Sequence, residues 1–196
     1  MKKHTTNLYG LVLTGGKSAR LGKDKYLIDY HGVPQVQYLY KLLVSLGLET
    51  FVACSKAQEE ILKPKYPVIV DKLKEIGPMG ALSAAFDTKS NGAWLIIACD
   101  LPFINQETIS ALIEARSKEH LLTTYQDFKS DFFETTISIY EPQVDVVMKN
   151  AYAVGQFSLR RAIDHSQIKI IQSNSSNELF NANTQEEVDF AKEKIS

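Results

Sequence analysis

Two adjacent glycines and four cations follow the first apolar run of the chain, in the stretch LVLTGGKSARLGKDK from Leu11 to Lys25. Gly15 and Gly16 remove side chains where the backbone must turn, so an outside group can approach backbone N–H donors closely. The positive charges indicate that this group is an anion; they belong to Lys17, Arg20, Lys23 and Lys25. A flexible basic loop without a ligand is the alternative that composition alone leaves open.

The spacing of these glycines excludes the two commonest phosphate motifs. A dinucleotide fingerprint needs GxGxxG, whereas here Gly15 and Gly16 are adjacent and the next glycine is Gly22. A P-loop needs four residues between its glycines and then Lys with Ser or Thr, but five residues intervene here and Asp24 follows Lys23. We therefore expect a long glycine-rich loop, rather than a helix N-terminus, to surround the anion.

Two aspartates follow apolar runs that are typical of buried strands. Asp100 ends the run LIIACD, where Pro102 prevents the strand from continuing, and Asp71 ends the run VIVD. Because ligands of open α/β sheets bind beyond the carboxyl ends of the strands, both carboxylates should lie near the glycine loop. A carboxylate that faces a polyanion is typical of Mg²⁺ sites, since Mg²⁺ combines few protein oxygens with phosphate oxygens and water. The alternative is that Asp100 only caps the turn that follows it.

Apolar periodicity predicts the elements that position these residues. Continuous apolar runs predict strands over residues 8–13, 50–54, 68–70 and 93–99, and alternation predicts another strand over 131–140. Helical spacing predicts helices over residues 35–46, 57–62, 81–86, 106–118, 144–152, 159–165 and 185–194. This order predicts an α/β fold in which helices cover both faces of a parallel sheet. No repeat or linker interrupts the 196 residues, so we expect one domain over residues 1–196.

The composition argues against several other classes of protein. A formal net charge of −1 argues against a nucleic-acid-binding protein, so any anion site must be local. The longest apolar run is far shorter than the roughly 20 residues that span a bilayer, and MKKHTTNLYG lacks the apolar stretch of a signal peptide. We therefore expect a cytoplasmic protein that contacts neither nucleic acid nor a membrane. Cys54 and Cys99 lie in apolar runs and should be buried as small hydrophobic residues.

Several segments together resemble the molybdenum cofactor guanylyltransferases, the molybdopterin-guanine dinucleotide biosynthesis protein A family of the nucleotidyltransferase superfamily. LTGGKSARLGKDK resembles the signature LAGGxSxRMGxDK, VDKLKEIGPMGAL resembles the D…GPLAGL segment, and CDLPFI resembles the CDxPF segment. FETTISIY, SLRRAI and FNANTQEEV also resemble segments of the family, in the family's order. The resemblance covers nearly the whole chain and implies a three-layer α/β/α fold, with a Rossmann-like, mostly parallel sheet of the nucleoside-diphospho-sugar transferase type.

The resemblance implies a reaction as well. The terminal phosphate of molybdopterin, or of the molybdenum cofactor, would attack the α-phosphate of GTP, so that pyrophosphate leaves and the guanine dinucleotide cofactor forms. Mg²⁺ would be the cofactor. The implied protein partners are upstream cofactor-assembly proteins and downstream molybdoenzymes or their chaperones.

The resemblance also assigns roles to individual residues. Arg20, Lys25 and Asp100 would be catalytic, because the cations neutralise charge on the α-phosphate and pyrophosphate while Asp100 holds Mg²⁺. The residues that would bind GTP are Leu13, Thr14, Gly15, Gly16, Lys25, Ser55, Asp71 and Asp100. The residues that would bind the acceptor are Arg160, Arg161, Asn181 and Asn183.

One departure from the family pattern leaves alternatives open. Ser55 stands where the family often offers an asparagine to the nucleotide, and its side chain reaches less far. The alternatives are a related nucleotidyltransferase that uses CTP with molybdopterin or a sugar 1-phosphate, and a relative that binds nucleotide without turnover. Asp100 beside the basic glycine loop argues against the last alternative, because binding alone would not need a metal carboxylate.

Overall fold

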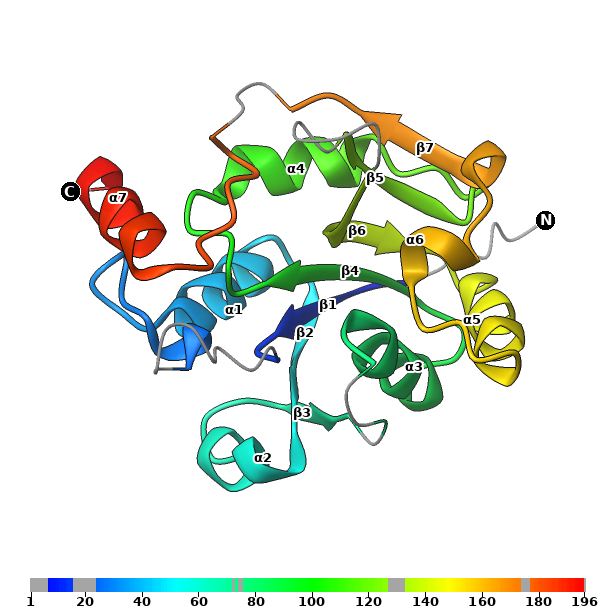
Figure 1. The fold of residues 1–196 in the computed structure, drawn as a ribbon, viewed down its shortest axis with the longest axis horizontal. Helices are drawn as coiled ribbons and strands as arrows, with labels where there is room; N and C mark the ends of the chain where they lie inside the picture. Colours follow the sequence, from blue (N-terminus) through cyan, green and yellow to red (C-terminus); the bar gives the residue numbers. More distant parts are fainter. Residues whose placement is uncertain are drawn as a thin grey trace.

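The computed structural model describes residues 7–15, 24–71, 73, 76–126, 133–173 and 177–195. Within these residues, seven strands form one sheet in the order β3-β2-β1-β4-β6-β5-β7 (Figure 1). The strands are β1 (Leu8–Leu13), β2 (Glu49–Cys54), β3 (Val68–Val70), β4 (Ala93–Ala98), β5 (Leu122–Gln126), β6 (Phe133–Tyr140) and β7 (Ile168–Ile171). All neighbours pair in parallel except that β6 runs antiparallel to β4 and β5, so the sheet is mostly parallel as expected.

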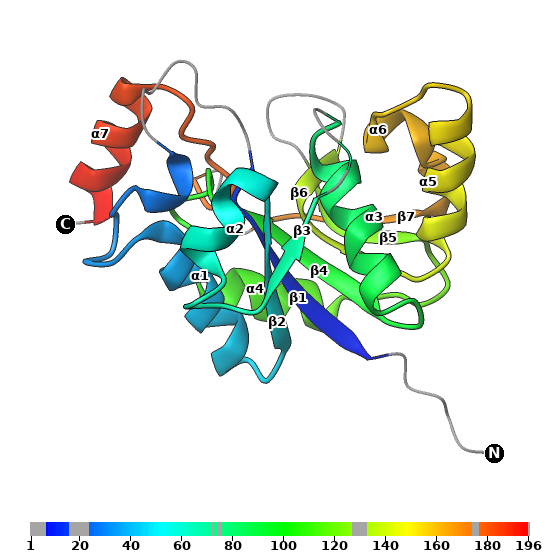
Figure 2. The ribbon, with the colours of Figure 1, turned by 90° about the horizontal axis from the view of Figure 1, so that it is seen from below.

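Helices cover both faces of this sheet (Figure 2). One face carries α3 (Pro78–Thr88), α5 (Val144–Ala153) and α6 (Leu159–Ala162), whose apolar side chains share a core with β1, β4 and β6. The other face carries α1 (Gln35–Ser45), α2 (Lys56–Leu62) and α4 (Gln106–Glu114), which form a second core with the same sheet. The predicted three-layer α/β/α arrangement is confirmed.

The C-terminal helix extends the fold beyond these layers. α7 (Gln185–Ile195) contributes Val188 and Ala191 to a small apolar cluster with Tyr30, which lies between the 3₁₀ helix η1 (Lys25–Leu27) and α1. The cluster fastens the last part of the chain to the segment that follows the glycine loop. It therefore brings residues 181–184, which read NANT, close to Lys25.

Burial in the sheet explains why its central strands were predictable. All six residues of β4 are buried, because β4 lies between β1 and β6 with a helical layer on each face. Such a strand needs apolar residues at every position rather than an alternating pattern. Cys54 and Cys99 are buried with free thiols, as predicted. Among the helices that the structure describes, none is long and apolar enough to cross a membrane.

Two strands and several helix ends differ from the sequence prediction. β5 and β7 were not predicted, and a second 3₁₀ helix, η2 (His165–Gln167), follows α6. The helix predicted over residues 106–118 ends at Glu114, because Arg116 turns away to form a two-point ion pair with Glu141 at 2.5 and 2.9 Å. The helix predicted over residues 159–165 is shorter for a related reason, since the Asp164 side chain accepts the N–H of Ser166 and begins η2.

Candidate active site

The carboxyl ends of four parallel strands meet at one edge of the sheet. Leu13 of β1 pairs with Ala53 of β2 and with Ala98 of β4, and β2 pairs with β3 up to Cys54. The residues that follow these strands therefore lie at the same edge, as predicted; they are Thr14, Ser55, Asp71 and Asp100. β1 and β4 point toward the side of the molecule that carries α7 (Figure 1).

Three side chains from distant parts of the sequence meet at this edge. The Lys25 ammonium donates to Asn183 Oδ1 at 2.5 Å and lies 3.5 Å from Asp100 Oδ2. The Lys25 and Asp100 side chains are only 16% and 22% exposed, so water screens their charges incompletely. We call Lys25, Asp100 and Asn183 the charged cluster. It places an ammonium group, which can bind phosphate oxygens, beside a carboxylate, which can bind a metal ion, and the Asn183 amide oxygen accepts from the ammonium.

The C-terminal segment is fixed to the charged cluster through its backbone. The Ala182 N–H donates to the Asp100 carbonyl at 2.8 Å. The Glu187 carboxylate accepts the N–H groups of Asn183 and Thr184 at 2.7 and 3.0 Å, and the Thr184 hydroxyl accepts the Glu187 N–H. This reciprocal cap at the start of α7 holds the Asn183 peptide in place. The pattern T-x-x-E is visible in the sequence but was not used to predict a role for Glu187.

The turn after Asp100 is held by side chains near the start of α1. His31 Nε2, Gln35 Nε2 and the Tyr38 hydroxyl donate to the carbonyls of Pro102, Leu101 and Ile104 at 2.9, 3.0 and 3.0 Å. The His31 ring also stacks on Tyr38, with centroids 3.7 Å apart. These contacts link the segment that carries Lys25 to the segment that carries Asp100. None of these three residues was predicted from the sequence, where the only signal was a glutamine at the start of an apolar helical pattern; in the structure Gln35 is fully buried.

The electrostatics of Asp100 suit a cation. Burial raises the pKa of its carboxyl group, and the neighbouring Lys25 ammonium offsets part of that rise. Oδ1 is buried and has no hydrogen-bond partner among the described residues. Because a buried polar atom without a partner is costly, this oxygen is suited to a ligand that supplies positive charge. The donor set fits Mg²⁺, which would complete its coordination with phosphate oxygens and water.

Asp71 lies where β3 passes toward α3. Its N–H donates to the Cys54 carbonyl at 2.9 Å, and its Oδ1 accepts the Leu73 N–H at 2.8 Å. Burial raises the pKa of Asp71, and the bond from Leu73 partly opposes this rise. A methyl group on Gly80, in the first turn of α3, would lie 2.6 Å from Oδ1. The Asp71 carboxylate can therefore occupy this position only because Gly80 has no side chain.

A further polar group lies between the ends of β1 and β2. Gln58 Oε1 accepts the Ser55 N–H and the Ser55 hydroxyl, each at 3.0 Å. The buried Thr14 hydroxyl donates to the Ala53 carbonyl at 2.7 Å and lies 3.4 Å from Gln58 Oε1. The N–H and the hydroxyl of Ser55 are therefore both engaged by Gln58, a residue that was not predicted to belong to the site. The signal was present, because S-x-x-Q at Ser55 and Gln58 is a capping-box pattern.

The other predicted residues lie in several places. Leu13 ends β1, and a Cβ atom on Gly15 would meet no atom of the described residues within 4 Å. Gly16 and Arg20 lie outside the described residues. Asn181 precedes the charged cluster in the C-terminal segment, and its Nδ2 donates to the Leu179 carbonyl at 3.4 Å.

The two arginines predicted to bind the acceptor belong to α6. Arg160 lies close enough to the Tyr140 hydroxyl of β6 to lower its pKa, although burial dominates and raises that pKa strongly. Arg161 is exposed. α6 covers the face of the sheet opposite to α1, so it does not share the layer that carries Lys25.

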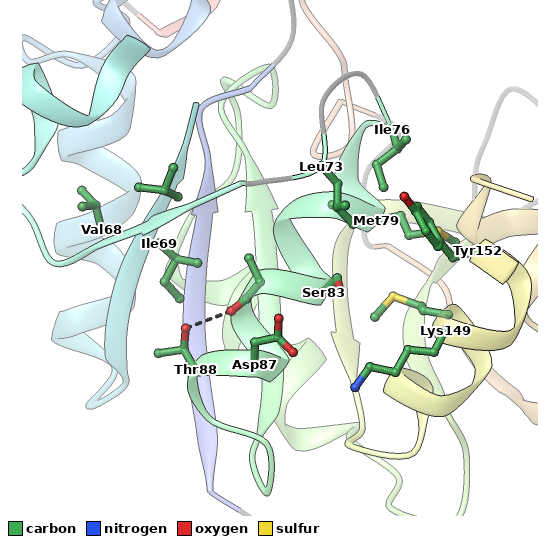
Figure 3. A pocket seen from close by; sticks show the side chains of 14 residues that line it. Val68, Ile69, Leu73, Ile76, Met79, Ser83, Asp87, Thr88, Lys149 and Tyr152 are labelled. Carbon is green, nitrogen blue, oxygen red and sulfur yellow. Dashed lines mark hydrogen bonds between the residues drawn. The ribbon is translucent and has the colours of Figure 1, made fainter. Parts of the chain in front are cut away.

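The structure also contains a groove beside this edge, with a volume of about 550 Å³. Ser83 and Asp87 of α3 line it, together with β3 and with Lys149 and Tyr152 of α5 (Figure 3). None of the predicted site residues lines it. Gly80 touches Asp71 on one side and the groove on the other, so the groove is a neighbour of the charged edge and not its centre.

Comparisons with known proteins agree with this arrangement. A family model described as a MobA-like NTP transferase domain matches residues 10–168. A molybdenum cofactor biosynthesis bifunctional protein of Synechocystis is 33% identical over 93% of this chain, although the chain spans only 53% of that protein's length. A molybdenum cofactor guanylyltransferase of Pseudomonas putida is 23% identical, with 90% of this chain and 93% of that protein covered.

The solved structures include a similar fold. Molybdopterin-guanine dinucleotide biosynthesis protein A from Archaeoglobus fulgidus superposes with a TM-score of 0.77 and 20% identity, covering 95% of this chain and 97% of that one. This similarity confirms the nucleotidyltransferase fold class. The matched family model spans most of the chain and includes the strand ends that carry Thr14, Ser55, Asp71 and Asp100. The chain therefore belongs to the family of proteins with a MobA-like NTP transferase domain.

Proposed function

We propose that the protein transfers GMP from GTP to the terminal phosphate of molybdopterin or of the molybdenum cofactor, releasing pyrophosphate and forming the guanine dinucleotide cofactor. The observation that carries this proposal is the charged cluster, in which Lys25 lies 3.5 Å from Asp100 at the edge of the sheet where β1 ends before Gly15. Relatives named molybdenum cofactor guanylyltransferase support the choice of GTP and of the acceptor.

The reaction moves negative charge but needs no covalent protein nucleophile. An oxygen of the acceptor phosphate forms a bond to the α-phosphorus of GTP, and the bond from this phosphorus to its bridging oxygen breaks. The electron pair of that bond leaves with pyrophosphate. Lys25 would stabilise the charge that develops on the α-phosphoryl oxygens, together with the N–H of Gly15. Gly16 and Arg20 would contribute in the same way, which remains a prediction from the sequence.

Mg²⁺ is the metal that we propose for the site. Asp100 would hold it, because Oδ1 is buried without a partner among the described residues. When bound, Mg²⁺ would neutralise phosphate charge and orient the triphosphate. Lys25 fixes the other carboxylate oxygen, Oδ2, and so keeps the Asp100 side chain in one orientation.

The remaining assignments concern the acceptor and the setting of the enzyme. Asn183 touches Lys25, so it lies at the boundary between nucleotide and acceptor; Asn181, Arg160 and Arg161 remain proposed acceptor ligands. Upstream cofactor-assembly proteins and downstream molybdoenzymes or their chaperones remain proposed partners. A cytoplasmic location is proposed as well.

The function is tested by pyrophosphate release from GTP, CTP and ATP, each with and without molybdopterin. We expect release only with the acceptor present, and a higher kcat/KM for GTP than for the other two. Equal use of GTP and CTP would replace the guanylyl assignment by the broader class of nucleotidyltransferase. Release that does not depend on molybdopterin would remove the proposed acceptor.

Asp71→Ala should reduce the preference for GTP. The Asp71 carboxylate can accept the N1–H and N2–H₂ groups of guanine, whereas adenine and cytosine present an acceptor at the corresponding ring nitrogen. A site that pairs polar groups in this way discriminates strongly, because the wrong base leaves buried groups unpaired. We expect the ratio of kcat/KM for GTP to that for CTP to fall by at least about tenfold. If Asp71→Ala keeps the wild-type ratio, Asp71 does not recognise the base, and the backbone near Leu13 and Thr14 becomes the proposed recognition site.

Gly80→Ala should weaken GTP use through the same carboxylate. The added methyl group would lie 2.6 Å from Asp71 Oδ1 and 2.9 Å from Cγ, so this short side chain must move. We expect KM for GTP to rise by about tenfold, the cost of one polar contact, with a smaller change in kcat. Ser83→Ala is the matched control, because Ser83 lies on the same side of α3, one turn further along, and also lines the groove. Equal effects of both substitutions would mean that the groove, and not Asp71, is being perturbed.

A further inference from the structure

Gln58 is held in one orientation at the edge of the sheet. The Ser55 N–H can only donate, so the Gln58 atom that it meets at 3.0 Å must be the carbonyl oxygen. The Ser55 hydroxyl donates to the same oxygen. The amide NH₂ group therefore faces away from the Ser55 backbone. Among the described residues, none accepts a hydrogen bond from Gln58 Nε2.

The position of Gln58 corresponds to one part of the proposed nucleotide site. In the order β3-β2-β1-β4, the glycine turn follows β1 and the metal carboxylate Asp100 follows β4. In the proposed site the triphosphate would therefore lie over β1 and β4, which leaves the ends of β2 and β3 for the base. Asp71 follows β3, and its N–H is bonded to the Cys54 carbonyl, next to Ser55. Gln58 is anchored on Ser55 and 3.4 Å from Thr14, so its amide lies at the ends of β1 and β2, next to the strand that Asp71 follows.

Helix capping alone does not require an amide at this position. Glu and Gln serve equally as the third residue of a capping box, because each offers an oxygen to the N-cap N–H. Glu would have the further advantage of a negative charge in the first turn of a helix. What Gln58 has and Glu lacks is a pair of N–H donors. The residue type thus adds a donor to an edge that Asp71 supplies with acceptors.

We propose that Gln58 recognises guanine by donating from Nε2 to O6, beside the N1–H and N2–H₂ groups that Asp71 accepts. Guanine presents O6 as an acceptor, whereas adenine and cytosine present an amino group at the corresponding position. Gln58 and Asp71 would thus match three adjacent groups of one base edge and oppose both other bases. This inference rests on the proposed use of GTP. It also accounts for Ser55, whose short side chain supports the amide instead of contacting the base.

The test compares GTP with 6-thio-GTP, which keeps the N1–H and N2–H₂ groups but has a weak acceptor at position 6. We expect the wild type to use 6-thio-GTP with a several-fold lower kcat/KM. Gln58→Glu keeps the capping oxygen and removes the donor, so it should lower kcat/KM for GTP by at least about tenfold and abolish the difference between the two nucleotides. Thermal unfolding should show an unchanged or higher Tm, because the cap is retained.

A matched variant separates base recognition from charge. Like Gln58→Glu, the substitution Lys63→Gln makes the net charge of the protein more negative by one unit. It lies at the C-terminal end of α2, where the Lys63 side chain is 70% exposed. It should leave the ratio of GTP to 6-thio-GTP unchanged. If Gln58→Glu lowers the use of GTP, CTP and ATP equally, repulsion of the triphosphate explains the loss and the proposal fails.

The outcomes also separate this inference from the proposed function. A wild type that uses GTP, CTP and ATP equally refutes guanine selectivity itself. A wild type that prefers GTP but does not distinguish it from 6-thio-GTP refutes the role of Gln58 alone, and this measurement needs no variant. Unchanged kcat/KM for GTP in folded Gln58→Glu would likewise leave Gln58 as a capping residue only.

Discussion

Asp100→Asn should nearly abolish nucleotidyl transfer while leaving the protein folded. The substitution keeps the shape of the side chain but removes the negative charge that would attract Mg²⁺. It also places a neutral amide beside the Lys25 ammonium, which lies 3.5 Å from Oδ2 in the wild type. We expect kcat/KM to fall by at least about 10³-fold at physiological Mg²⁺, comparable to or larger than the loss of one strong electrostatic contact to a transition state. Steady-state pyrophosphate release measures this effect.

The fold should tolerate this change, because the structural bonds at Asp100 come from its backbone. The carbonyl accepts the Ala182 N–H at 2.8 Å, and an asparagine offers the same carbonyl. The matched control is Asp87→Asn, which removes an exposed carboxylate from α3 and should leave the rate unchanged. Direct Mn²⁺ binding gives a readout besides activity and should weaken in Asp100→Asn. If activity instead follows the folded fraction, Asp100 only caps its turn.

The parts of the fold that were predicted are those that a local pattern encodes. β1 and β4 must be apolar at every position because both faces of the strand are covered, so their runs stand out in the sequence. β5 reads LTTYQ, and its buried Thr124 is satisfied by the Glu134 carbonyl and the Ser138 hydroxyl of β6. Those partners are set by tertiary pairing, so the local pattern does not reveal the strand.

The difference between local patterns and tertiary contacts also explains which site residues could be predicted from the sequence. Asp71 and Asp100 were predictable because each ends an apolar run in the sequence, and parallel strands end at one edge. The contact between Lys25 and Asn183 joins opposite ends of the chain and depends on the docking of α7 against Tyr30. No periodicity encodes such a contact. The family resemblance assigned Asn183 to the acceptor, and in the structure its side chain accepts a hydrogen bond from the Lys25 ammonium.

Lys25→Ala should lower kcat far more than it weakens GTP binding. Electrostatic stabilisation acts on the charge that develops at the α-phosphate and on the departing pyrophosphate, so its loss appears mainly in the transition state. We expect kcat to fall on the order of 10²–10³-fold, as for other single electrostatic contacts of this kind. Lys41→Ala, which removes an exposed cation from α1, is the matched control and should be neutral. Unchanged kcat in Lys25→Ala would show that Lys25 does not contribute to catalysis and that the basic charges of this loop are only solvated surface charges.

Lys25→Ala should also change the pH dependence of the reaction, because Lys25 lies beside the Asp100 carboxylate. Lys25 lowers the pKa of Asp100 against the larger effect of burial, so its removal should let that pKa rise further. Asp100 must be ionised to hold a cation, and a higher pKa means that ionisation is completed only at higher pH. The acid limb of the residual pH–rate profile should therefore move to higher pH in Lys25→Ala, whereas Lys41→Ala should leave it in place. A profile that keeps its wild-type position while kcat falls would show that Lys25 acts on the phosphates alone, without tuning the carboxylate beside it.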